Sequence, residues 1–258
     1  MRAFFLELIM AVMIVGFLPV MTMRSVYAET PPPLEETAAH TITNDPFEPV
    51  NRSIFDVNDF LDRLLLRPLA ELDRALLPPE IRDRIVGILR NMREPVVLTN
   101  NLLQGEFDRA GITAERFAIN TTLGVGGMFD WANEWELYQQ KGDFGQTLYV
   151  WGVDSGPYLV LPLFGPSNVR DAVGVGVDTL MSPWPYAVRT GGTSTYDTFE
   201  IVNFGMGGIT KREQNIDVID ALRSGSLDFY AQMRSAYNQH RNHELGVEGM
   251  LVSPVMIP

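Results

Sequence analysis

Few side chains in this sequence could carry catalysis. The chain has no cysteine, and its three histidines are His40, His240 and His243. A Ser–His–acid triad would need one of the last two, and no Gly-x-Ser-x-Gly nucleophile elbow is present. His240 and His243 stand about one helical turn apart and could share a metal ion, but no third ligand accompanies them, which favours a solvated helix end. The sequence indicates no enzyme, no metal and no cofactor.

Two of the chain's Gly-x-Gly pairs are candidates for a nucleotide-binding turn. They are Gly124 with Gly126, followed directly by Gly127, and Gly174 with Gly176. Neither pair has the final glycine of the dinucleotide fingerprint, and neither follows a convincing strand. Glycines for tight turns or close helix packing are the better interpretation.

Several charged residues lie in apolar or glycine-rich surroundings. Asp130 follows Met128-Phe129, Arg170 and Asp171 follow an apolar stretch, and Glu94 precedes Pro95. One interpretation is capping or paired structural charges. The other is a polar lining for a passage through an apolar body.

The elements that must position these residues begin after a leader. Residues 8–18 form an uncharged apolar run behind Arg2, and Val26-Tyr27-Ala28 offers a cleavage site. The run is interrupted by Pro19 before it is long enough to span a membrane, which favours a cleaved signal peptide over residues 1–28 rather than an anchor helix. Residues 29–43, rich in proline and glutamate, are typical of a flexible tether.

The absence of cysteine and the excess of acidic residues exclude several classes of exported protein. An exported chain without cysteine has no disulfides and cannot be a lipoprotein, because it lacks the lipobox cysteine. The chain has 20 basic and 32 acidic residues, and removal of the leader with Arg2, Arg24 and Glu7 leaves 18 and 31, a net charge of −13. This argues against nucleic acid and against a polybasic membrane binder.

Helical periodicity dominates the remainder. The first helix is predicted from about Asp45, as N-cap, to a kink or end at Arg67-Pro68, with apolar residues at steps of three and four. A second begins at Pro78-Pro79, contains Pro95 and is capped by Gly105, and a third covers 106–122.

Later segments are more broken. Residues 142–166 predict short helices and extended pieces with room for one tight hairpin. Ser167 is expected to cap a helix reaching about Leu180, and a long helix is expected over 213–240, with Gly225 as a weak point. An apolar tail covers 246–258. The predicted class is mainly α, built from kinked amphipathic helices with little or no β. The apolar stripes alone do not decide between a protein core and a membrane surface.

Motifs along 44–245 together resemble one known family. They are Asn44-Asp45-Pro46 with Asn51-Arg52; Arg67-Pro68-Leu69-Ala70; Asn91 with Glu94-Pro95; Asn100 with Leu103-Gln104-Gly105; Arg116-Phe117 with Asn120; Gly124-x-Gly126-Gly127 with Asp130; Phe144-Gly145-x-Thr147-Leu148; Gly152-Val153 with Gly156-Pro157-Tyr158; Leu161-Pro162; Arg170-Asp171; Leu227-Asp228-x-Tyr230; Arg234-x-x-Tyr237; and Gln239-x-Arg241. In order and spacing they resemble the MlaA/VacJ family.

The resemblance implies a ring of helices in the inner leaflet of the outer membrane, on its periplasmic face, with a central channel. It implies a non-enzymatic component that removes misplaced phospholipid from the outer leaflet and passes it to a soluble periplasmic carrier, beside a trimeric outer-membrane porin. The residues expected to line the channel or carry the family motif are Asp45, Asn51, Arg52, Asn120, Gly124, Gly126, Gly127, Asp130, Arg170 and Asp171.

Two other functions stay open at this point. One is a soluble periplasmic carrier that holds a lipid in a cavity, and the other is an envelope scaffold for porins. The missing lipobox cysteine departs from the family's lipoprotein members. The expectation is that the apolar rim, a porin contact or an uncleaved leader holds the protein at the membrane.

Overall fold

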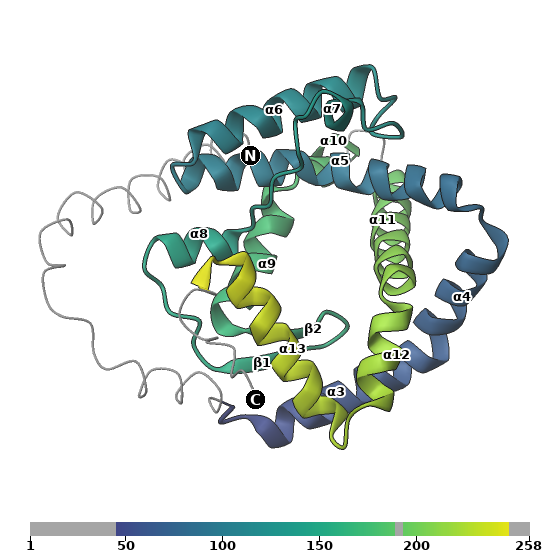
Figure 1. Ribbon diagram of the computed structural model, residues 1–258, viewed down its shortest axis with the longest axis vertical. Coiled ribbons are helices and arrows are strands. Elements are labelled where there is room, and N and C mark those ends of the chain that lie inside the picture. Colours follow the sequence, from purple (N-terminus) through teal and green to yellow (C-terminus); the bar gives the residue numbers. More distant parts are fainter. Residues whose placement is uncertain (1–44, 189–192, 248–258) are drawn as a thin grey trace, which may run out of the picture.

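The computed structural model describes residues 45–188 and 193–247, and their helices follow one another around a central space (Figure 1). The predicted signal peptide and all but two residues of the predicted tail lie outside the described residues, as does the tether. The elements, in chain order, are α3 (Glu48–Leu61), the π-helix η1 (Asp62–Leu66), α4 (Arg67–Leu76), α5 (Pro79–Leu103), α6 (Phe107–Thr122), α7 (Trp131–Glu134), α8 (Phe144–Val150), β1 (Tyr158–Leu161), β2 (Gly165–Asn168), α9 (Val169–Met181), α10 (Trp184–Val188), α11 (Thr193–Gln214), α12 (Ile216–Ser224) and α13 (Phe229–Glu244). The mainly helical prediction is confirmed, and the hairpin is β1–β2.

The first helix begins later than predicted. Phe47 occupies the N-cap position of α3, so the prediction that Asp45 is the N-cap is wrong. The Asp45 carboxylate instead accepts a hydrogen bond from Asn51 Nδ2 at 2.7 Å and pairs with Arg234 of α13 at 2.8 Å. Both oxygens of the Asp45 carboxylate are thus directed at Asn51, Tyr230 and Arg234 rather than at a backbone N–H of the first helical turn.

The kink predicted at Arg67-Pro68 takes the form of a π-helical segment between α3 and α4. Pro68 has no N–H to donate to the preceding turn, and the wider turn of η1 directly before it absorbs this defect. Pro95 is accommodated within α5, which together with α6 follows the predicted bounds closely. Gly105 ends α5 with a φ of +76°, as expected for a glycine C-cap.

Two predictions for the later helices need correction, and one helix is not predicted. The single helix over 213–240 is wrong, because the chain breaks after Gln214 and again at 225–228, although the second break begins at the weak point expected at Gly225. Asp228 caps the last helix by accepting from Ala231 N at 3.2 Å. The sequence does not predict helix α11, since Gly205, Gly207 and Gly208 weaken its helical signal. Asn168, rather than Ser167, caps α9 by accepting from Asp171 N at 2.8 Å.

The main buried cluster lies where the hairpin meets α3 and α13. Tyr158, Val160 and Tyr230 form it, and Phe55 packs against it in edge contacts. Asn51 of α3 serves as a partner for β1: its Nδ2 donates to Tyr158 O at 3.0 Å, and Val160 N donates to its Oδ1 at 3.0 Å. One side-chain amide thereby reproduces the pair of bonds that a neighbouring strand would make.

The outward side of α3, η1 and α4 presents large apolar side chains that the other described residues leave exposed. Its exposed side chains are Val50, Val57, Phe60, Leu64, Leu65, Leu69, Leu72 and Leu76. This set is called the α3–α4 apolar face. The other side of these helices is held to α11 and α12 by ion pairs such as Arg212 with Asp62 at 2.6 Å and Arg67 with Asp220 at 2.9 Å. Within the described ranges, no helix combines the length and apolarity needed to cross a membrane.

Candidate functional site

The predicted site residues do not converge on one point. The structure places them in three polar groups, each of which joins segments that are distant in the sequence. The first contains Asp45, Asn51 and Arg52, the second Asn120, Asp130 and the glycines 124, 126 and 127, and the third Arg170 and Asp171.

The first group closes the ring of helices by joining α3 to α13. Arg52 pairs with Asp228 at 2.5 Å and with Glu48 at 2.8 Å, and its guanidinium lies 4.4 Å from the centre of the Tyr230 ring. Asp45 accepts from the Tyr230 hydroxyl and from Arg234. The hydrogen bonds from Arg52 lower the pKa of Asp228 to about 2, so this closure is charged at neutral pH.

The third group is a buried ion-pair network that joins α8, α9 and α13. Arg241 donates to both oxygens of Asp171 at 2.9 Å and to those of Asp143 at 2.7 Å, and the Tyr237 hydroxyl donates to Asp171 at 2.6 Å. Burial acts to raise the pKa of Asp171, but the bonds from Arg241 and Tyr237 lower it. Arg170 adds a further contact to Asp171 at 3.2 Å.

The second group holds the loop after α6 against α5 and α6. Asp130 accepts from Asn120 Nδ2 at 2.9 Å and pairs with Arg116 at 3.1 Å. Partial burial acts to raise the pKa of Asp130, but the bonds from Asn120 and Arg116 lower it. Arg116 also faces Glu94 at 3.4 Å, and burial raises the pKa of that carboxyl.

The glycines in this loop differ in their reasons to be glycine. Gly127 has a φ of +98°, and a Cβ there would lie 2.4 Å from the Cβ of Asn91. Gly126 has a φ of +73° but open space around it. Gly124 is blocked as well, since a Cβ would meet Phe129 O at 2.2 Å. Gly124 and Gly127 therefore serve close packing and Gly126 serves a tight turn, which agrees with the packing-or-turn interpretation made from the sequence.

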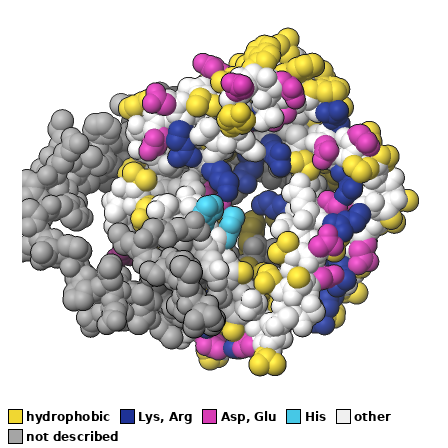
Figure 2. All heavy atoms as spheres, viewed as in Figure 1, with side chains coloured by type: hydrophobic (Ala, Val, Ile, Leu, Met, Phe, Trp, Pro, Cys, Tyr) yellow, Lys and Arg dark blue, Asp and Glu magenta, His cyan; other side chains and the backbone are white. Residues whose placement is uncertain are grey.

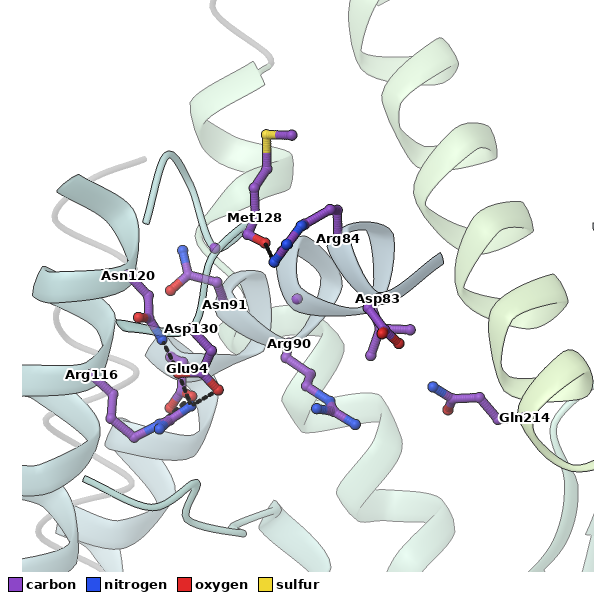
Figure 3. Close-up of a pocket in the computed structure, with 13 residues that line it drawn as sticks. Asp83, Arg84, Arg90, Asn91, Glu94, Arg116, Asn120, Met128, Asp130 and Gln214 are labelled. Carbon is purple, nitrogen blue, oxygen red and sulfur yellow. Dashed lines mark hydrogen bonds and ion pairs between the residues drawn. The ribbon is translucent and has the colours of Figure 1, made fainter. Parts of the chain in front are cut away.

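Asn120, Gly127 and Asp130 of this second group line a cavity of about 220 Å³, which the close-up in Figure 3 shows on the side of α5. Arg90 extends from α5 toward α11, where Gln214 lies opposite it, and Arg84 donates to Met128 O at 3.2 Å. Two buried acceptor atoms of the lining, Asn91 Oδ1 and Glu94 Oε2, have no hydrogen-bond partner. The cavity thus offers both a free cation and free acceptors.

A run of cations along α5 and α11 escaped sequence reasoning. Arg90 and Arg93 lie one turn apart on α5, and Lys211 lies on α11, which packs against α5. All three side chains have substantial solvent-accessible surface, although protein atoms around the Lys211 ammonium partly desolvate it. They are called the inner-wall cations. The sequence contains one signal for them. Arg90 and Arg93 are like charges at positions i and i+3 of a predicted helix, an unfavourable pair unless another group neutralises it.

Across residues 45–188 and 193–247, no group of three His, Asp or Glu side chains could bind a metal ion. His240 lies 3.4 Å from Glu244, an ordinary contact at a helix end. The geometry suits the binding of a charged group beside an apolar surface. The fold and this polar cavity define a mainly helical protein with an exposed apolar face.

Comparisons with known proteins agree. The chain belongs to the MlaA lipoprotein family, which it matches over residues 43–244. It is 33% identical over 213 residues to the intermembrane phospholipid transport system lipoprotein MlaA of Haemophilus influenzae, covering 81% of this chain and 82% of that protein. The protein of the same name from Escherichia coli is 33% identical over 208 residues, with 77% of each chain covered.

A solved structure, described as the structural basis for maintenance of bacterial outer membrane lipid asymmetry, is also similar. It matches with a TM-score of 0.63 at 34% identity, over 78% of this chain and 98% of that chain. The resemblance seen in the sequence motifs is thereby confirmed.

Proposed function

We propose that this protein is a non-enzymatic component of intermembrane phospholipid transport. It lies in the inner leaflet of the outer membrane, takes mislocalised phospholipid from the outer leaflet and passes it to a soluble periplasmic carrier. A trimeric porin is its neighbour in the membrane. The names of the relatives from H. influenzae and E. coli support the part of this proposal that concerns intermembrane phospholipid transport.

The observation that carries the proposal is the contrast between the outside and the inside of the ring. The α3–α4 apolar face exposes eight large apolar side chains to the outside. Burying one such side chain contributes roughly 1.5–3 kcal/mol, so several together suffice for a stable interfacial position without a spanning helix. Figure 2 shows the opposite character inside, where Lys and Arg side chains gather along the central hollow over α5.

A phospholipid crosses such a body only if its head group has a polar path. The cavity beside Asp130 and Arg90 supports that path, and Asp130 itself is proposed to line it. For Arg170 and Asp171, the buried network with Arg241 supports a role in fixing the wall around the passage. Net transfer then follows from differential affinity between successive carriers, and no reaction is needed in this protein.

The experiment is complementation of a deletion strain, with phospholipid in the outer leaflet as the readout. Loss of the gene should raise outer-leaflet phospholipid, and the wild-type gene should restore the low level. Leu65→Glu with Leu72→Glu places two charges on the α3–α4 apolar face and should fail to restore it, with the protein released from the membrane fraction.

The matched control adds the same charge elsewhere. Gln232→Glu with Gln239→Glu changes two exposed positions on α13 and should complement fully. An unchanged outer leaflet in the deletion strain would contradict the proposed function. A wild-type protein found only in the soluble periplasm would instead favour a soluble lipid carrier, and altered porin assembly with a normal outer leaflet would favour a scaffold.

A further inference from the structure

The inner-wall cations Arg90, Arg93 and Lys211 are set apart because none of them forms an ion pair within 4 Å or donates a hydrogen bond to a described residue. Every other lysine or arginine of the described residues forms an ion pair or donates to a protein oxygen. The three inner-wall cations make no such contact with a described side chain. This is unexpected in a chain with 32 acidic residues and only 20 basic ones, where acids are abundant.

Nearby carboxylates are turned to other partners. Glu94 and Asp130 both face Arg116. Asp178 on α9 accepts from Asn100 Nδ2 at 2.8 Å, and the charge of Arg93 acts on Asp178, but the two side chains form no ion pair. Asp83 is the exposed carboxylate of the cavity wall that has no ion pair with a described residue. Three cations without an ion pair outnumber Asp83 and the nearby Asp178, which leaves this part of the wall with a net positive charge.

The cations also lie close enough to repel one another. Desolvation among the surrounding protein atoms lowers the pKa of Lys211, and the charge of Arg93 lowers it further. Like charges on neighbouring helices without an anion are unfavourable, and an anion placed between them would relieve the repulsion. Figure 2 shows basic side chains gathered at the hollow, and Figure 3 shows Arg90 directed away from α5 toward α11.

We infer that Arg90, Arg93 and Lys211 bind the phosphodiester of a phospholipid head group and give the protein a preference for net-anionic over zwitterionic phospholipid. A guanidinium pair offers planar donors that match phosphate oxygens, and Lys211 adds a point charge. A zwitterionic head group brings its own ammonium toward a wall with one unpaired acid, so it gains less. This inference rests on the proposed function and deepens it.

The test uses soluble short-chain lipids, so that membrane contact does not enter. Binding of dihexanoyl phosphatidylglycerol and dihexanoyl phosphatidylethanolamine to the whole protein is measured by ³¹P line broadening, below the concentrations at which they form micelles. A charge about 4 Å away in water-like surroundings changes an equilibrium roughly fivefold. We expect tighter binding of the phosphatidylglycerol, and a loss of about tenfold or more in Arg90→Gln/Arg93→Gln/Lys211→Gln.

Three controls make the result decisive. Arg90→Lys/Arg93→Lys keeps the charge and should retain the preference. Arg63→Gln/Lys141→Gln removes two exposed cations that belong to ion pairs elsewhere and should leave binding unchanged. The triple variant removes no ion pair or hydrogen bond with the described residues, so its circular dichroism and melting temperature should match the wild type; a misfolded triple variant would contradict the free-cation description itself.

The outcomes separate this inference from the function beneath it. Equal binding of the two lipids, or a triple variant that binds phosphatidylglycerol normally, overturns the inference even if the wild-type gene restores the outer leaflet. Inorganic phosphate that binds as tightly as the lipid and displaces it overturns the lipid assignment in favour of a free-phosphate site. Failure of the wild-type gene in the deletion assay, with the binding preference intact, would overturn only the transport function.

Discussion

Substituting Gly127 by alanine is the sharpest test of how the loop after α6 is held. The glycine has a φ of +98°, beyond the left-handed region near +50 to +70° that other residues occasionally adopt. Its Cβ would lie 2.4 Å from the Cβ of Asn91 and 2.8 Å from Gly87 O, both on α5. The substitution therefore combines backbone strain with overpacking against a rigid helix.

The matched control is Gly126→Ala, one residue earlier. Gly126 also has a positive φ, +73°, but nothing lies within 4 Å of its Cβ position. Backbone strain alone costs about 1–2 kcal/mol. Overpacking adds roughly 1–3 kcal/mol at Gly127, so we expect Gly127→Ala to lose about 2–5 kcal/mol of unfolding free energy and Gly126→Ala about 1–2 kcal/mol.

The assay is thermal and denaturant unfolding followed by far-ultraviolet circular dichroism. For a domain of this size, 1 kcal/mol corresponds to about 2–4 °C in melting temperature. A third variant, Gly111→Ala, lies within α6 with open space and no positive φ, and should be neutral or slightly stabilising. Equal losses for Gly126→Ala and Gly127→Ala would refute the reasoning, because they would show that α5 does not oppose a side chain at residue 127.

Four further outcomes follow from the polar groups. Arg241→Met should cost about 3–5 kcal/mol in denaturant unfolding, because Asp171 and Asp143 then face each other without their shared cation; a loss below about 1 kcal/mol would contradict a buried network. Arg52→Gln should cost at most about 1 kcal/mol, since its pair with Asp228 is largely exposed, and a loss like that of Arg241→Met would contradict this ranking. Burial raises the pKa of Asp178 to about 6, so the folded state holds this proton more tightly than the unfolded state. The unfolding free energy of the wild type, measured relative to Asp178→Asn, should therefore fall as the pH rises from about 4 to 6. A difference that does not change with pH would show that Asp178 titrates normally. The pKa of Asp171 is lowered, so its contribution is present above the ordinary aspartate range and is lost as the pH falls below about 4; Asp171→Asn should lessen the acid dependence of the unfolding midpoint, and an unchanged acid limb would contradict the assignment.

The early helices could be predicted from the sequence because their signals are local. Prolines at 78, 79 and 95 and the glycine at 105 fix the bounds and interior of α5 through their own backbone restrictions. The role of Asp45 could not be predicted in this way. Its partners Tyr230 and Arg234 are more than 180 residues away, and a local capping rule cannot anticipate a competing distant cation.

For the candidate site as well, local features could be predicted from the sequence and long-range contacts could not. The motif order identified the family, and the interpretation of the glycines at 124 and 127 as packing glycines is confirmed. The separation of the ten predicted residues into three groups depends on which helices become neighbours around the ring. The absence of ion pairs at Arg90, Arg93 and Lys211 depends in addition on which cation each acidic side chain pairs with. Only a structure shows these pairings.

The amide partners of strand β1 have a consequence for register. Besides Asn51, which bridges Tyr158 and Val160, Asn58 bridges Leu161 and Leu163 by accepting from Leu163 N and donating to Leu161 O, both at 2.9 Å. The seven residues from Asn51 to Asn58 advance a helix by about 10.5 Å, and the three residues from Tyr158 to Leu161 advance a strand by about 10 Å. The two spacings are nearly equal, so the side-chain amides of Asn51 and Asn58 on α3 fix the position of the hairpin along the helix. A single-residue insertion between Asn51 and Asn58 would rotate and shift one amide relative to the other. The hairpin could then keep its hydrogen bonds to only one of the two asparagines.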